Sequence, residues 1–202
     1  MEVTIRNTNE QDYYKTEYIT LEAFWDVYKP GCDEHLVLHI IRNSHCFIKE
    51  LDFIAIHENE IIGHIICTKA KVINTLNKEY EVLCVGPISI LPEFQKKGIG
   101  SKLMFRSITD AKKLGFHGMI LFGNPDYYHR FGFKNAAEYG ITTKDCLNFE
   151  PFMALELLDN GFRDIQGKFY EDSAFEIHPE ELVEFEKHFP YKEKHKTATQ
   201  FK

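Results

Sequence analysis

The sequence contains few cysteines, and they are not arranged as metal ligands or as a redox pair. The five cysteines are an odd number and no two form a C-x-x-C pair; they are Cys32, Cys46, Cys67, Cys84 and Cys146. This spacing favours neither a zinc knuckle nor a disulfide framework. We interpret the cysteines as reduced thiols and therefore expect a cytoplasmic protein.

The sequence also lacks long apolar runs and an excess of positive charge. No uncharged apolar stretch approaches the roughly 18–20 residues that cross a bilayer, and residues 1–6 do not resemble the start of a signal peptide. The chain has 24 Lys and Arg against 31 Asp and Glu, a formal net charge of −7. Because a nucleic-acid backbone repels an acidic chain, we expect neither a nucleic-acid nor a membrane partner.

The composition is that of a globular protein with a core of its own. The 202 residues are 44% hydrophobic and 27% charged, which is ordinary usage for one compact domain. No internal repeat and no linker rich in Gly, Ser or Pro divides the chain.

Apolar periodicity and turn residues predict alternating strands and helices. Strands are expected at residues 3–7, 52–57, 61–72, 81–91 and 118–123, from 133 onward, and at 167–170. Helices are expected at residues 10–28, 33–42, 98–114, 126–131, 152–158 and 179–189. The polar residues from 191 onward are expected to form a frayed, solvated end. This order predicts an α/β fold with a partly antiparallel sheet.

Three local features refine this prediction. The polar residues 58–60 are suited to a hairpin between two strands, and Asp33 is a candidate cap for the second helix. The pair Gly86-Pro87 predicts a bulge or a local break in pairing, because proline cannot donate to a sheet ladder.

The most informative stretch is a glycine-rich turn between an expected strand and an expected helix. It comprises Gln95, Lys96, Lys97, Gly98, Ile99, Gly100 and Ser101. Free backbone N–H groups at a helix N-terminus bind anions, and glycine lets the backbone approach a phosphate closely. The spacing is neither that of a Walker A loop nor that of a dinucleotide fold. The turn therefore predicts a pyrophosphate site, against the alternative of an ordinary strand-to-helix connection.

Two blocks of sequence carry a family pattern. Residues 86–100 read G-P-I-S-I-L-P-E-F-Q-K-K-G-I-G, and residues 121–133, one helix farther on, read L-F-G-N-P-D-Y-Y-H-R-F-G-F. Together they resemble the central motifs of the GNAT acetyltransferase superfamily, and the resemblance covers residue 3 to about residue 170. The N-P-D-Y-Y wording, with C-D-E-H-L at residues 32–36, is most similar to bacterial YhbS-like predicted N-acetyltransferases.

The resemblance implies a single-domain GNAT fold, with splayed strands in a mixed central sheet flanked by helices. It implies a GNAT domain at residues 1–170 and a helical C-terminal extension at 171–202 that packs on or trails from it. It also implies an enzyme that transfers an acetyl group from acetyl-CoA directly to a primary amine of a small molecule or peptide, as a monomer or homodimer.

The same resemblance implies roles for individual residues. Main-chain groups of Ile88, Ser89 and Ile90 would contact the pantetheine arm of coenzyme A, and residues 95–101 would hold its pyrophosphate. Asn124 would line the gap between the splayed strands. Tyr128 would be the general acid that protonates the departing thiolate of coenzyme A.

The general base stays open at this point. Only about one alkylamine in a thousand is neutral at pH 7, so deprotonation matters. Many relatives carry a glutamate just upstream of the apolar-x-Pro pattern, whereas this chain has Gly86 and Pro87 there. The candidates are Glu81, Glu34, His35 and an ordered-water route. Glu34 and His35 are also expected to line the acceptor pocket.

Alternatives to this interpretation remain. The i, i+4 spacing of His35 and His39 fits two metal ligands, but no third ligand is evident, and we expect no metal. Cys32 near His35 raises the possibility of a thiol nucleophile, which direct transfer does not need. The chain could instead be a non-catalytic acyl-CoA-binding sensor, or could transfer a bulkier acyl group or acetylate a protein amine.

Overall fold

The computed structural model describes residues 1–198 and 200, which form two compact units. The first unit comprises Met1–Ile66, Pro87–Leu103 and Ser173–Lys202, and the second comprises Cys67–Gly86 and Met104–Asp172. Three elements begin in one unit and end in the other; they are β3 (Glu60–Ile73), β4 (Glu79–Ile90) and α3 (Ile99–Lys113). The chain returns to the first unit at Ser173.

The sheet of the first unit is antiparallel. Strand β1 (Thr4–Asn7) pairs with β2 (Phe47–His57), which neighbours β3, and β3 neighbours β4. Glu58 and Asn59 connect β2 to β3 with φ angles of 48° and 66°. Two successive positive φ angles are the geometry of a tight two-residue hairpin turn. The hairpin expected at residues 58–60 is therefore confirmed.

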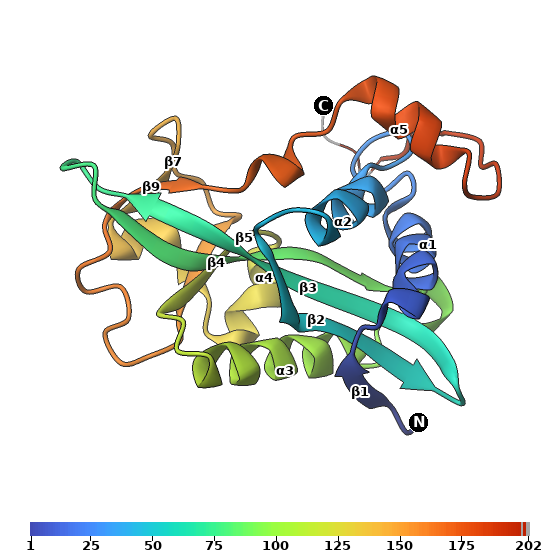
Figure 1. The fold of residues 1–202 in the computed structure, drawn as a ribbon, viewed down its shortest axis with the longest axis horizontal. Coiled ribbons are helices and arrows are strands. Elements are labelled where there is room, and N and C mark those ends of the chain that lie inside the picture. The colour runs from blue at the N-terminus through green and yellow to red at the C-terminus, as the bar shows by residue number, and fades with distance from the viewer. Residues whose placement is uncertain (199, 201–202) are drawn as a thin grey trace. The chain divides into compact units, whose positions relative to one another are not determined.

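Helices α1 (Tyr13–Phe24) and α2 (Glu34–Arg42) pack against each other in the first unit, and α5 (Pro179–Glu186) lies over them (Figure 1). Two short 3₁₀ segments, Glu10–Asp12 and Ser173–Phe175, precede α1 and α5. Helix α1 ends four residues before the expected position, because Trp25 leaves the helical region with ψ 124°. Among the described residues, no helix has the length and apolar character needed to cross a membrane.

Asp33 stands at the N-cap position of α2, but its side chain does not cap the helix. Its carboxylate forms an ion pair with Lys29 instead. The capping role considered for Asp33 is therefore wrong, because a nearby ammonium group competes with the backbone N–H groups for the carboxylate.

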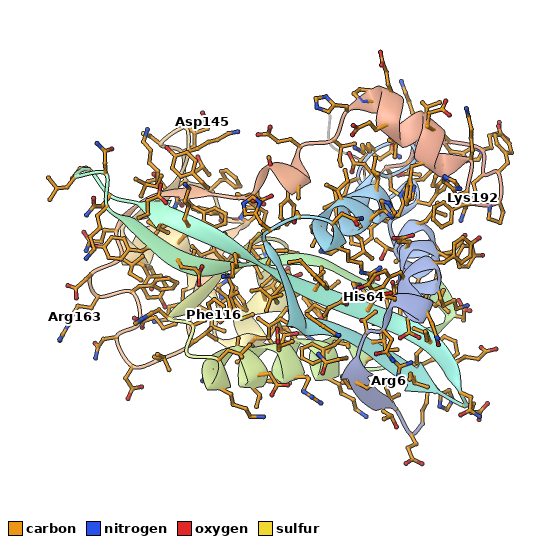
Figure 2. All side chains as sticks on the ribbon, in the orientation of Figure 1. Arg6, His64, Phe116, Asp145, Arg163 and Lys192 are labelled. Atoms are coloured by element: carbon orange, nitrogen blue, oxygen red, sulfur yellow. The ribbon has the colours of Figure 1, made fainter. Side chains whose placement is uncertain are left out.

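A buried polar network ties α1 and α2 to β2 and β3. Arg42 donates through Nε to Asp52 Oδ2 at 3.2 Å and through Nη2 to Thr16 Oγ1 at 2.9 Å. Asp52 Oδ1 also lies 2.7 Å from His64 Nε2, and Figure 2 shows His64 on its strand. Asp52 and His64 are 1% and 0% exposed. Removing one member would leave a buried charge uncompensated, which costs several kcal/mol in general.

The C-terminal segment makes specific contacts that a frayed end would not make, although most of residues 191–198 are exposed, as expected for a solvated end. Asp26 accepts hydrogen bonds from the His195 backbone N–H at 3.0 Å and, through its carbonyl oxygen, from Thr197 Oγ1 at 3.0 Å. Lys192 and Lys194 both lie 5.7 Å from the ring centroid of Trp25. Charge and cation–π contacts hold these polar residues, which a prediction based on polarity alone cannot anticipate.

The sheet of the second unit is mixed. Strands β3, β4, β5 (Gly118–Phe122), β8 (Phe152–Glu156) and β6 (Lys134–Asn135) neighbour one another in this order. On the other side, β9 (Gly167–Tyr170) pairs with β3 and with β7 (Ile141–Thr143). Strands β4 and β5 are parallel, whereas β5 and β8 are antiparallel. The short helix α4 (Pro125–Tyr128) and the 3₁₀ segments His129–Phe131 and Ala136–Tyr139 complete this unit.

The helix expected at residues 152–158 is wrong, because β8 occupies this segment. Each residue of β8 pairs with one residue of β5, from Phe152↔Phe122 to Glu156↔Gly118. Phe152, Met153 and Ala154 are all 0% exposed, so side chains on both faces of the strand are buried. A short apolar run buried on both faces has no strand periodicity, and its sequence cannot be told from that of a buried helix.

Candidate functional site

The end of β4 presents alternate side chains to opposite faces in the first unit. Ser89 is 1% exposed, and its Oγ lies 3.0 Å from Thr20 Oγ1 of α1. The Thr20 hydroxyl donates its proton to the Thr16 carbonyl oxygen at 2.8 Å. In the contact between Thr20 and Ser89, the Ser89 hydroxyl is therefore the donor. Ile88 and Ile90 are half-buried and, by strand alternation, point to the other face. The Ser89 hydroxyl is thus bonded to α1 and faces away from the side of the strand on which Ile88 and Ile90 lie.

The glycine-rich turn follows as the chain leaves β4. After the 3₁₀ segment Pro92–Phe94, Lys96 and Gly98 have φ angles of 59° and 80°, and α3 begins at Ile99. The Gln95 side chain donates from Nε2 to the Ile90 carbonyl oxygen at 3.1 Å and so fixes the turn to the strand. A Cβ added at Gly98 would meet nothing within 4 Å. The turn therefore has open space above Gly98, next to the backbone N–H groups of the first turn of α3.

Strands β4 and β5 separate in the second unit. Among the described residues their ladder has two pairs, Leu83↔Met119 and Cys84↔Ile120. Beyond Ile120, β5 continues to Phe122 and pairs only with β8 on its other side. The break in pairing expected near Gly86 is therefore found on the β5 side of β4.

Tyr128 and Asn124 follow β5 in the second unit. Asn124 caps α4 by accepting a hydrogen bond at Oδ1 from the Asp126 backbone N–H at 2.9 Å. The Tyr128 ring lies 5.8 Å from the Phe133 ring and 5.0 Å from the Tyr127 ring, both in edge-on geometry. A Cβ built at Gly123 would overlap the Tyr128 ring. Glycine at this position is what lets the tyrosine ring lie against the end of β5.

A comparison of the sequence with models of known protein families agrees with the motifs and the geometry described above. A model described as "Acetyltransferase (GNAT) family" matches residues 7–133. The chain belongs to the GNAT family. The matched range includes the glycine-rich turn, Asn124 and Tyr128, and it ends before β8, β9 and α5.

Solved GNAT structures share this fold. A GNAT family acetyltransferase from Brucella melitensis in complex with acetyl-CoA has a TM-score of 0.71 and 25% identity, over 86% of this chain and 98% of that one. YhbS from Escherichia coli, solved in complex with CoA, has a TM-score of 0.74 and 16% identity, over 88% and 93% of the two chains. The expected GNAT fold, with a mixed sheet whose strands splay apart, is confirmed.

Relatives with similar sequences are named as uncharacterized N-acetyltransferases. YjhQ from Escherichia coli K12, an uncharacterized N-acetyltransferase, is 28% identical over 87 residues. That match spans 43% of this chain and 48% of YjhQ, so it covers about half of the relative's length. YhbS is 19% identical over 132 residues, 65% of this chain and 69% of YhbS. The similarity to YhbS-like proteins is confirmed.

The structure places Glu34 and His35 of this GNAT chain at the start of α2. His35 is 0% exposed, and its ring lies 5.5 Å from the Phe185 ring and 5.4 Å from the Phe189 ring. Glu34 Oε2 accepts a hydrogen bond from the Asp33 backbone N–H at 3.1 Å, and burial raises the pKa of its carboxyl. Aromatic side chains of the C-terminal segment therefore cover His35. The sequence analysis expected His35 to line an acceptor pocket and did not anticipate this cover.

Cys32 and His39 do not support the other chemistry considered for this region. Burial, together with the charges of Glu34 and Asp33, raises the pKa of the Cys32 thiol. The thiol therefore stays protonated and is a poor nucleophile. His39 Nδ1 lies 3.0 Å from Glu17 Oε1, and the described residues hold no cluster of potential ligands suited to a metal ion.

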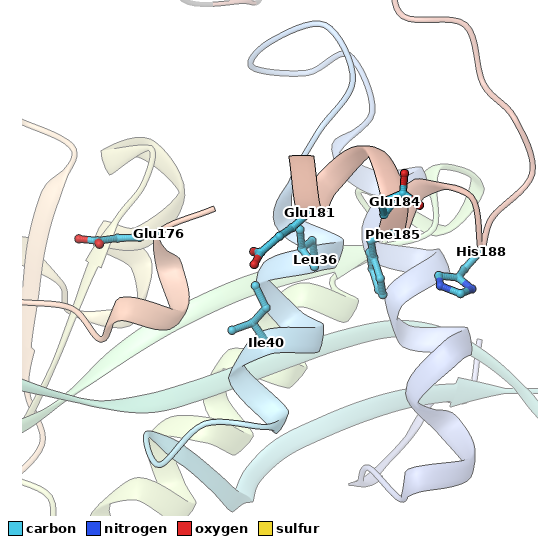
Figure 3. A pocket seen from close by; sticks show the side chains of 7 residues that line it. All are labelled: Leu36, Ile40, Glu176, Glu181, Glu184, Phe185 and His188. Carbon is cyan, nitrogen blue, oxygen red and sulfur yellow. The ribbon is translucent and has the colours of Figure 1, made fainter. Parts of the chain in front are cut away.

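A hollow of about 470 Å³ lies between α2 and α5 in the first unit. Its apolar floor is formed by Leu36, Ile40 and Phe185, and Figure 3 shows acidic side chains at its edge. Those acidic residues are Glu176, Glu181 and Glu184, and Glu184 forms an ion pair with Lys187 at 2.5 Å. The hollow contains none of the residues expected to bind acetyl-CoA or to catalyse transfer.

A further carboxylate, which the sequence analysis did not consider, lies beside β4 in the second unit. The Cys84 thiol donates to Glu171 Oε1, with an Sγ–Oε1 distance of 3.6 Å. Glu171 follows directly after β9 and is 87 positions from Cys84 in the chain. No local motif marks Glu171, because only the pairing of β9 with β3 brings it to β4.

Proposed function

We propose that this chain is an N-acetyltransferase that moves an acetyl group from acetyl-CoA directly to a primary amine of a small molecule or peptide. The observation that carries the proposal is the separation of β4 and β5 after Cys84↔Ile120, with Tyr128 following β5. Separated parallel strands expose main-chain groups that a flat sheet would pair. Two relatives of the same fold, from Brucella melitensis and Escherichia coli, were solved with acetyl-CoA and CoA.

The residues of the glycine-rich turn fit the diphosphate of the cosubstrate. Gly98 has a positive φ and open space where a side chain would stand, so an anion can approach its backbone closely. Lys96 and Lys97 are exposed beside it and add positive charge. The turn, from Gln95 to Ser101, is therefore the proposed pyrophosphate site, with backbone N–H groups as donors.

The strand and α4 supply the remaining proposed contacts. Main-chain groups of Ile88, Ser89 and Ile90 pair with the pantetheine arm, and one N–H polarises the thioester carbonyl. Tyr128 protonates the coenzyme A thiolate as the carbon–sulfur bond breaks. Asn124, exposed at the start of α4, contacts the cosubstrate.

Two measurements test the proposal. Acetyl-CoA is incubated with the protein and a panel of amines and peptides, and acetylated products are detected by mass spectrometry alongside released thiol. Tyr128→Phe should lower turnover about 100-fold or more while the Kd for acetyl-CoA changes little, because the ring is kept and only the hydroxyl is lost. Binding of acetyl-CoA without any acetylated product would favour a sensor, and unchanged turnover in the variant would remove Tyr128 as the acid.

A further inference from the structure

The proposed reaction needs a group that deprotonates the acceptor, and two of the candidates drawn from the sequence, Glu81 and His35, do not fit well. Glu81 is exposed and forms an ion pair with Lys69 at 3.3 Å. His35 is closed off beneath Phe185 and Phe189. A carboxylate that lies at the separation of β4 and β5 would be better placed.

Glu171 lies at this position. Its Oε1 is 3.6 Å from the Sγ of Cys84, and Cys84 belongs to the last pair of the β4–β5 ladder. Cys84 is 1% exposed, whereas Glu171 as a residue is exposed. The side chain of Glu171 therefore reaches inward from the surface, and its carboxylate lies where the two strands begin to diverge.

Strand geometry defines the face of the sheet on which Glu171 lies. Paired residues point to the same side, and side chains alternate along a strand, so Cys84, Ile120 and Phe122 share one face. The Phe169 ring of β9 lies 6.3 Å from the Phe122 ring on this face. Glu171 is two residues after Phe169 and is placed on the same face by its contact with Cys84.

Tyr128 lies on the opposite face of the same sheet. A Cβ built at Gly123 would contact both the Tyr128 ring and Leu121 Cδ1. Leu121 precedes Phe122, so its side chain points to the other face. Glu171 and Tyr128 thus lie on opposite faces of the second unit's sheet, Glu171 beside Cys84 of β4 and Tyr128 beside the end of β5.

We propose that Glu171 is the general base of the reaction and removes a proton from the acceptor amine, directly or through one water. This rests on the proposed acetyltransferase function. An acid and a base on opposite faces suit the transfer, because the amine arrives on one side of the thioester carbonyl and the thiolate leaves on the other.

The protons and bonds of the step balance. The acceptor ammonium gives one proton to Glu171, which later releases it to solvent. The amine nitrogen attacks the thioester carbonyl carbon, forming a C–N bond as the C–S bond breaks. Tyr128 protonates the sulfur and is reprotonated by the second proton lost from nitrogen, so an amide, a thiol and one released proton result.

The surroundings of Glu171 raise the pKa of its carboxyl, which favours a role as a base. Withdrawal from water raises the pKa of its carboxyl, while the Cys84 thiol and the positive charge of Lys144 act in the opposite direction. A base is most effective when its pKa lies near the working pH. Because withdrawal from water is the largest of these effects, the pKa of the carboxyl is raised and Glu171 is more basic than a solvated glutamate.

The test uses the full chain, acetyl-CoA and an amine that the native protein acetylates. Glu171→Gln should lower kcat about 100-fold near pH 7, with the Kd for acetyl-CoA within about twofold of native. The defect should shrink as the pH approaches the pKa of the amine, about 10, because a free amine needs no base. Unchanged acetyl-CoA binding shows that the variant is folded, and recovery at high pH is not expected from a merely structural defect.

Two variants on β4 serve as comparisons. Glu79→Gln removes an exposed carboxylate that pairs with Lys71 at 2.8 Å, and it should leave kcat unchanged. Glu81→Gln tests the rival base on the same strand. An active native protein whose Glu171→Gln variant keeps the native kcat and pH profile would overturn the assignment, as would loss of turnover in Glu81→Gln alone. If the native protein acetylates no amine, the proposed function itself fails.

Discussion

Acidification should destabilise this protein through His35, because burial prevents the ring from taking up a proton. His35 is 0% exposed beneath Phe185 and Phe189, and its Nε2 has no hydrogen-bond partner among the residues that the structure describes. Its Nδ1 lies 3.6 Å from the Cys32 sulfur. Burial lowers the pKa of His35 from 6.5 to about 4, with Asp33 opposing this shift and Lys194 adding to it.

The direction and size of the effect follow from this pKa. Between pH 6.5 and pH 4 the unfolded chain binds a proton at His35 and the folded chain does not, so the free energy of unfolding falls as the pH falls. The contribution of His35 is fully present above about pH 6.5 and is lost progressively toward pH 4. Between pH 7 and pH 5 the loss amounts to about 2 kcal/mol.

Urea unfolding at pH 5, 6 and 7 measures this loss, followed by the fluorescence of the single tryptophan, Trp25. His35→Gln removes the titrating group and keeps a polar side chain of similar reach. The native protein should lose about 2 kcal/mol more than the variant over this pH range. Other buried groups, including His64, titrate in both proteins and cancel in the difference.

Equal pH dependence of the native protein and His35→Gln would refute the reasoning. It would mean that the α5 segment opens and hydrates His35 before the protein unfolds.

Two substitutions probe how the proposed site is held in place. Gly123→Ala should displace the Tyr128 ring and lower kcat at least 10-fold with little change in the Kd for acetyl-CoA; native kcat would show that the ring can shift without cost. Thr20→Val should leave the Ser89 hydroxyl without its acceptor, lower the free energy of unfolding by about 1–3 kcal/mol in urea titrations and weaken acetyl-CoA binding, whereas Thr20→Ser should stay near native. Equal stability of the two Thr20 variants would contradict the structural importance of that hydrogen bond.

The sequence was sufficient to predict the part of the fold where the backbone conformation depends on the residue types of the segment itself. The turn after β4 needs a positive φ at Gly98, and the strand before it contains a proline. Both features appear directly in the residue types, so the strand, turn and helix were placed within two residues. Tyr128 could be singled out for the same reason, since its motif is short and contiguous.

The features that the sequence did not reveal depend on long-range contacts. Glu171 acquires its neighbours only because β9 pairs with β3, and Cys84 is far from it in the chain. The closure over His35 depends on Phe185 and Phe189, more than 140 residues away. Residue type alone cannot distinguish such a buried histidine from a ligand-binding one.

The C-terminal segment has a consequence for the order in which the protein is made. Residues from Ser173 onward complete the first unit, which begins at Met1, so the N-terminal helices leave the ribosome long before Phe185, Phe189 and His195 are available to cover them. Until then the apolar surface around His35 and the turn at Asp26 have no cover. The first unit therefore stays incomplete until residues from Phe185 onward have been made, and its nascent N-terminal helices should be open to chaperone binding until then.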